Sequence, residues 1–185
     1  MNKNAENLQR ILERVTALLR NERRNKLIEH GLLPVQFDVL YYLASCNRYS
    51  DTLMALTEYL GQTKGTVSQT LKVLEKKALI YRSRDEKDKR IIHLQLSDEG
   101  ERIVGSETTS ALLTGIDETA AAALVDGLTH LLSTVQKANR SKAFGQCRNC
   151  RFNQHQENGS FFCALTQETL SSTEVTQICV EFEAP

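Results

Sequence analysis

The sequence lacks several features that mark whole classes of protein. No stretch approaches the roughly 20 apolar residues of a membrane-spanning helix, and residues 1–6 hold no apolar core of a secretion signal. We therefore expect a cytoplasmic protein with no membrane partner. There is no internal repeat and no low-complexity tract. The formal net charge is zero, which excludes a protein that adheres to nucleic acid through excess positive charge alone.

The charge that is present is distributed unevenly. Residues 53–95 hold nine Lys or Arg against five Asp or Glu. Residues 96–142 hold four against seven, and residues 143–185 hold two against five. A basic middle region in a neutral chain is typical of a protein that presents one face to a polyanion. The length of 185 residues suffices for one good core and a small appendage.

Apolar residues at three- and four-residue spacing predict helices on both sides of this basic region. One spans roughly residues 4–29, a second starts at Pro34, and two more begin at Ser97 and Asp117. We expect the helix from Ser97 to end at Gly115, because glycine is common just after a helix C-terminus.

Two short helices and a hairpin are predicted within the basic region. Thr52 and Thr63 are suitable N-caps, and Gly61 between them suits the left-handed end of the first helix. Residues 90–96 then alternate as a strand that can pair with residues 79–82, across a charged tip. Two short helices followed by a charged hairpin form the pattern of a winged helix-turn-helix.

The sequence therefore predicts a mainly α fold with a small β-hairpin, of the α+β class. Residues 35–97 form the winged helix-turn-helix domain in this interpretation. Residues 1–34 and 98–142 form a helical dimerisation region, and residues 143–185 form a Cys-rich C-terminal extension.

The second short helix carries side chains suited to the major groove of DNA on the face opposite its apolar stripe. Gln pairs with adenine edges, Ser and Thr reach bases or phosphates, Lys reaches guanine or phosphate, and Gly allows close approach. The predicted contacts from this helix are Thr63, Lys64, Gly65, Thr66, Ser68, Gln69 and Lys72.

The hairpin supplies a second set of predicted DNA contacts, at a tip that can enter a minor groove. We expect Asp88 to hold the side chain of Arg90 extended by a charge-assisted hydrogen bond. The predicted wing contacts are Arg84, Lys87, Asp88, Lys89 and Arg90.

These segments resemble the MarR family of winged helix-turn-helix transcription regulators. The resemblance rests on the runs LGQTKGTVSQ (60–69), LEKKALI (74–80), RSRDEKDKR (82–90) and LQLSDEG (94–100). It covers residues 5–140 in element order. The sequence departs from the family at Ala78, where glycine is frequent, and in the first helix, which lacks the cysteine of the peroxide-sensing subtype.

The resemblance implies a homodimer, formed by the first and last helices, that represses transcription from a pseudo-palindromic operator in double-stranded DNA. It implies that Arg90 enters the minor groove and that Asp88 positions it. It also implies a small-molecule effector pocket between the dimer helices and the winged domain. Phe37, Tyr41 and Tyr42 could line this pocket, but aromatic residues on a helix face are more often plain core residues.

The C-terminal extension holds four of the five cysteines, in the spacing C-x2-C-x12-C-x15-C. The predicted metal ligands are Cys147, Cys150, Cys163 and Cys179, the number that a tetrahedral zinc site or an iron–sulfur cluster needs. A structural zinc ion is the first choice and an iron–sulfur cluster the alternative, ahead of a thiol–disulfide switch or inert buried thiols. Cys46 is interpreted as a small core residue.

Two other classes of function remain as alternatives. One is a thiol or metal redox protein, but Cys147 has no βαβ unit around it, and no catalytic arrangement of Cys, Ser, His and Asp is evident. The other is an interaction module whose helix-turn-helix does not touch DNA. The basic face of the second short helix favours a DNA-binding regulator that is not an enzyme.

Overall fold

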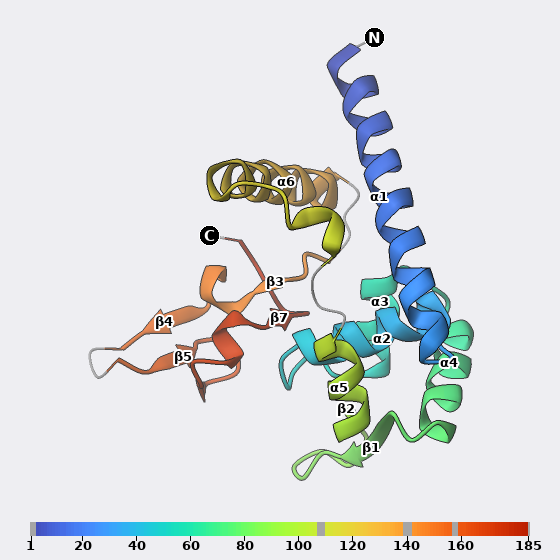
Figure 1. Cartoon of the computed structure of the whole chain (residues 1–185). Coiled ribbons are helices and arrows are strands. Elements are labelled where there is room, and N and C mark those ends of the chain that lie inside the picture. Colours follow the sequence, from blue (N-terminus) through green and yellow to red (C-terminus); the bar gives the residue numbers. More distant parts are fainter. Residues whose placement is uncertain (1–2, 107–109, 139–141, 157–158, 185) are drawn as a thin grey trace.

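The computed structural model describes residues 3–106, 110–138, 142–156 and 159–184. Six α-helices and the wing hairpin precede the C-terminal extension (Figure 1). These elements are α1 (Lys3–Glu29), α2 (Pro34–Ser45), α3 (Leu53–Leu60), α4 (Lys64–Lys76), β1 (Ile80–Arg84), β2 (Ile92–Leu96), α5 (Asp98–Ser106) and α6 (Glu118–Ala138). The predicted α+β class is confirmed. Among the described residues, none of the helices combines the length and the apolar character needed to span a bilayer.

The boundaries of the short helices follow from local chemistry. Thr52 and Thr63 cap α3 and α4, each accepting a hydrogen bond from a backbone N–H three residues ahead. Gly61 ends α3 with φ of 61°, a conformation that costs glycine little. Pro34 occupies the first turn of α2, where its missing N–H has no intrahelical partner to lose.

Strands β1 and β2 pair antiparallel from Ile80 opposite Leu96 to Arg84 opposite Ile92. Strand β1 therefore ends at Arg84, two residues beyond the predicted end of this strand at residue 82. The carboxylate of Asp85 closes the tip by accepting hydrogen bonds from the backbone N–H groups of Lys87 and Asp88.

The main core lies under α2 and joins α1, α3, α4, β2 and α5. Phe37, Leu40, Leu56, Leu71 and Leu94 are among its fully or almost fully buried members. The predicted apolar stripe of α4 is confirmed in this core. This one core therefore holds α4 and the base of the wing in place relative to each other.

Helix α5 ends at Ser106, so the prediction that this helix continues to Gly115 was wrong. Residues 107–109 lie outside the described part of the chain, and a 3₁₀ turn (η1, Ala111–Leu113) precedes α6. Ser110 caps that turn through its hydroxyl, which accepts a hydrogen bond from the N–H of Leu112. Serine at such a position offers the backbone an alternative to continued helix.

The C-terminal extension is a small β unit with its own core. Its strands are β3 (Gly145–Gln146), β4 (Asn153–His155), β5 (Phe161–Cys163), β6 (Glu168–Leu170) and β7 (Ile178–Cys179), with 3₁₀ turns η2 (Cys147–Asn149) and η3 (Glu174–Thr176). Strands β4, β5 and β6 form one antiparallel sheet, and β3 pairs with β7.

This extension is docked on the loop between α2 and α3. Asn47 donates its backbone N–H to the carbonyl of Ile178 at 2.9 Å, and Ser50 Oγ accepts the N–H of Val180 at 2.8 Å. The ring of Phe144 packs edge-on against Tyr59, with centroids 5.2 Å apart. The β unit and the winged domain therefore share a polar and aromatic interface.

Candidate nucleic-acid interface and cysteine cavity

Helix α4 presents the face that the sequence predicts for DNA. Val67, Leu71 and Leu74 are fully buried against the core. The opposite face holds the predicted contacts, with Ser68 half-buried and the others exposed: Thr63, Lys64, Gly65, Thr66, Gln69 and Lys72. Thr63 Oγ1 accepts the N–H of Thr66 at 3.2 Å, which fixes the N-terminus of the helix. A rigid helix with small and basic side chains outward can enter a major groove.

The wing tip contains the expected Asp88–Arg90 pair. Arg90 Nε and Nη2 donate to the Asp88 carboxylate at 3.0 and 2.8 Å. The Arg90 side chain is still 91% exposed, so it projects from the tip. This pairing lowers the pKa of Asp88 and raises that of Arg90. The predicted hydrogen bond is confirmed, and the minor-groove role of Arg90 stays a prediction.

The other predicted wing cations have different partners. Lys89 Nζ donates to the backbone carbonyl of Asp85 at 3.0 Å, and Arg84 is exposed. Lys87 Nζ lies 2.8 Å from Glu168 Oε1, in the C-terminal extension. The hydrogen bond from Lys87, followed by that from Tyr49, lowers the pKa of Glu168 to about 2. This contact could not be predicted from local sequence patterns, because its two members lie 81 positions apart.

His93 is a further residue that the sequence interpretation missed. Its side chain is only 18% exposed. Its Nδ1 lies 2.6 Å from Asp51 Oδ1 and its Nε2 lies 3.2 Å from Asp85 Oδ2. Burial lowers the pKa of His93, but the hydrogen bonds to both aspartates outweigh burial and raise it. The imidazole thus ties the wing tip to the loop before α3.

The four cysteines of the extension line one small cavity of about 20 Å³. Cys147 and Cys179 are buried, whereas Cys150 and Cys163 are partly buried. The remaining wall consists of Tyr49, Phe152, Asn153, Leu165, Thr166, Leu170 and Glu181. Within the part of the chain that the structure describes, no group of three His, Cys, Asp or Glu side chains is arranged to hold one metal ion.

Two of the sulfur atoms accept hydrogen bonds from N–H donors. Asn47 Nδ2 donates to Cys147 Sγ at 3.2 Å, and the N–H of Glu183 donates to Cys150 Sγ at 3.5 Å. Cys147 and Cys179 also share a hydrogen bond, which raises the pKa of Cys147 and lowers that of Cys179. Asn47 belongs to the winged domain, so the cavity is in direct contact with the predicted DNA-binding unit.

Several other predicted residues have structural roles. Cys46 is buried in the main core, and burial raises its pKa to about 12. Phe37 and Tyr42 are fully buried core residues rather than the walls of an effector pocket, while Tyr41 is partly exposed. The small-molecule effector stays a prediction.

The comparisons with known proteins agree with this geometry. The sequence profile of the MarR family matches residues 30–91. Comparison with curated protein sequences gives no match. Among solved structures, the transcriptional regulator PA3341 is 25% identical with a TM-score of 0.61, over 70% of this chain and 98% of that chain.

MepR of S. aureus resembles the chain in two structures. In its DNA-binding conformation it is 25% identical with a TM-score of 0.60, over 70% of this chain and 98% of that chain. In its complex with DNA it is 24% identical with a TM-score of 0.54, over 68% of this chain and 96% of that chain. Almost a third of the present chain thus has no counterpart in these regulators.

Proposed function

Because the chain belongs, through residues 30–91, to the MarR family of winged-helix transcription regulators, we propose that it is a repressor that binds double-stranded DNA as a homodimer. The structural neighbours are transcription regulators and not enzymes. The observation that carries the proposal is the pairing of an outward, basic face on α4 with a wing tip whose Arg90 is held extended by Asp88. Such a protein works in the cytoplasm, where the chromosome of a bacterium lies.

The exposed apolar faces of α1 and α6 support the homodimer. Helix α6 has 21 residues and, in the described chain, no buried side chain, although it carries the exposed residues Leu124, Val125, Leu128, Leu132 and Val135. Helices of this kind gain most of their stability from packing. In α1, Leu8, Ile11, Val15 and Leu18 are also exposed. A second copy that covers both faces accounts for these surfaces and sets the spacing of two recognition helices.

The direct test is selection of a binding site from random duplexes, followed by fluorescence anisotropy against salt concentration. We expect Lys72→Ala and Arg90→Ala each to weaken binding to the selected duplex, by roughly tenfold for a lost base or groove contact. Arg102→Ala on α5 is the matched control, because Arg102 pairs with Glu99 away from the recognition face. Unchanged affinity in both variants would remove the assignment and favour the interaction module.

The four cysteines form the second part of the proposed function, as the ligands of a metal centre. Four thiolates around one zinc ion lie about 3.8 Å apart, given Zn–S bonds of about 2.3 Å in a tetrahedron. The cysteines share one cavity, yet among the described residues no three ligand side chains converge on a single metal position. The proposal is supported by the C-x2-C-x12-C-x15-C spacing and by the shared cavity, with structural zinc as the first choice and an iron–sulfur cluster as the alternative.

Metal and sulfide analysis with a visible spectrum, on protein purified without oxygen, tests this part. Iron and sulfide in a coloured protein support the cluster. One zinc per chain in a colourless protein rejects the cluster and supports structural zinc instead. Protein without bound metal would reject both, and free-thiol counting would then distinguish a disulfide from inert cysteines.

A further inference from the structure

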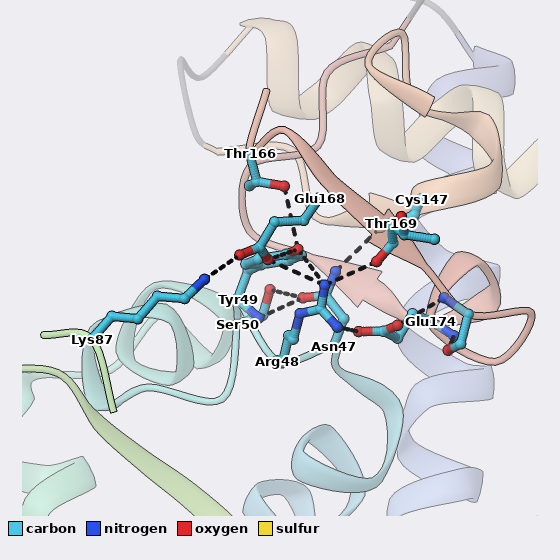
Figure 2. Close-up of polar contacts among 11 residues, drawn as sticks. Asn47, Arg48, Tyr49, Ser50, Lys87, Cys147, Thr166, Glu168, Thr169 and Glu174 are labelled. Atoms are coloured by element: carbon cyan, nitrogen blue, oxygen red, sulfur yellow. Dashed lines mark hydrogen bonds and ion pairs between the residues drawn. The ribbon is translucent and has the colours of Figure 1, made fainter. Parts of the chain in front are cut away.

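Glu168 lies between the cysteine cavity and the wing. It is the cross-strand partner of Cys163 in the β5–β6 pair, so the two residues share one rung of the sheet. Its carboxylate forms an ion pair with Lys87 Nζ at 2.8 Å. It also accepts hydrogen bonds from the hydroxyl of Tyr49 at 2.7 Å and from Arg48 Nη2 at 3.2 Å (Figure 2). One side chain therefore joins a cavity-lining strand to a predicted DNA-contacting lysine.

The loop beneath Glu168 carries a second set of contacts between the same two regions. Asn47 bonds to Cys147 on the cavity side, and Arg48 pairs with Glu174 at 2.7 Å (Figure 2). Further along this loop, the carbonyl of Asp51 accepts the backbone N–H of Leu94 in β2 at 2.7 Å. The loop is thus fixed to the β unit on one side and to the wing strand on the other.

The Lys87–Glu168 contact opposes the use of Lys87 on DNA. The lysine side chain is 85% exposed, so its stem is free to reach a phosphate. With its ammonium 2.8 Å from a carboxylate, the charge that would attract the phosphate is already compensated. The carboxylate itself would also lie near the DNA backbone and repel it. Release of Lys87 would restore one phosphate contact per wing and remove one negative charge from the interface.

We propose that the C-terminal β unit is an autoinhibitory clamp on the wing, in which Glu168 withholds Lys87 from DNA. Glu168 is held in place by the hydroxyl of Tyr49, by Arg48 and by its position in the β5–β6 pair. Release of the Lys87–Glu168 contact frees Lys87 and raises the affinity for DNA. The inference rests on the proposed DNA-binding function and defines a regulation of it.

The first experiment measures binding of Glu168→Gln and of wild type to the selected duplex over a range of salt concentrations. We expect tighter binding by the variant, by roughly fivefold per wing at about 0.15 M salt, and a salt slope steeper by about 0.9 per wing. Glu183→Gln is the matched control, because Glu183 pairs with Arg151 within the β unit at 2.6 Å. Equal affinity and slope for Glu168→Gln and wild type would overturn the clamp.

The second experiment tests whether Glu168 acts through Lys87, the residue that it contacts at 2.8 Å. Glu168→Gln should tighten DNA binding in the wild-type background and much less in a Lys87→Ala background, as a double-mutant cycle shows. An equal gain in both backgrounds would overturn the clamp.

The two levels of proposal fail in distinguishable ways. A wild-type protein with no salt-dependent affinity for any selected duplex would reject the DNA-binding function itself. A wild-type protein that binds DNA, together with a Glu168→Gln variant that binds identically, would reject only the clamp.

Discussion

His93 Nδ1 lies 2.6 Å from Asp51 Oδ1, which joins strand β2 of the wing to the loop in front of α3. The other imidazole nitrogen faces Asp85, whose carboxylate also closes the wing tip. The tip end of the wing is therefore held by one histidine between two carboxylates.

This arrangement predicts a pH-dependent stability. The folded pKa of His93 is raised above its ordinary value of 6.5, so the stabilisation is complete below the unfolded pKa and is lost as pH rises through the folded pKa. We expect the unfolding free energy of wild type to fall over this range above pH 6.5. His93→Ala should lose about 2 kcal/mol at pH 6 and show a smaller decrease with pH.

Urea unfolding of both proteins between pH 6 and pH 9 measures this difference. His155→Ala is the control, because His155 is exposed and packs against Phe161 within the C-terminal β unit. A pH dependence that is the same in His93→Ala and wild type would contradict the prediction.

Ala78 has a left-handed backbone, with φ of 54°, between α4 and the first wing strand. This conformation costs a residue with a Cβ about 1–2 kcal/mol. Glycine avoids that cost, but it also raises the conformational entropy of the unfolded chain, which offsets part of the gain in stability. We expect Ala78→Gly to raise the unfolding free energy by about 0.5–1 kcal/mol, measured by urea unfolding. Ala44→Gly, at an exposed site within α2, should instead lower it by about 1 kcal/mol. A destabilised Ala78→Gly variant would mean that the strain is absent.

Asn47 is buried and serves both the winged domain and the cysteine cavity. Its amide donates to Cys147 Sγ, and its carbonyl accepts Ser50 Oγ at 2.8 Å and the N–H of Tyr49 at 3.2 Å. We expect Asn47→Ala to destabilise the protein by about 2–3 kcal/mol, because buried partners lose their hydrogen bonds. The C-terminal β unit should become sensitive to limited proteolysis before the winged domain does.

Ser45→Ala is the control for this variant, since it removes a hydrogen bond within α2, to the carbonyl of Tyr41. Proteolysis of the β unit at the same rate in Asn47→Ala and wild type would show that Asn47 does not hold it in place.

Leu128 lies on the exposed apolar face of α6 with 46% of its surface accessible. If a second copy covers this face, Leu128→Glu buries a charge in the interface and should convert the dimer to a monomer. We expect a halved mass by light scattering and a loss of operator affinity of at least 100-fold, since half-sites are then bound singly. His130→Glu, two residues along the same helix and on its other side, is the control. A Leu128→Glu protein that stays dimeric would place the interface elsewhere.

The sequence by itself determined the elements whose signals lie within a few residues of one another. Thr52, Gly61 and Thr63 define the helix-turn-helix because capping and left-handed turns depend on local backbone chemistry. Asp88 and Arg90 were predictable as a pair for the same reason, being two residues apart at the tip of a hairpin. The length of α5 was not predictable, because several serines and threonines compete with helix near its end.

Only the tertiary structure decided how the C-terminal segment meets the rest of the chain. The contacts from Asn47 to Cys147 and from Lys87 to Glu168 join residues 100 and 81 positions apart. The spacing of the cysteines in the sequence indicated that they form one group. It did not indicate that the β unit would contact the loop at Asn47 and the wing at Lys87. Long-range pairing depends on which surfaces become complementary after each unit has folded, and a local pattern contains no record of that.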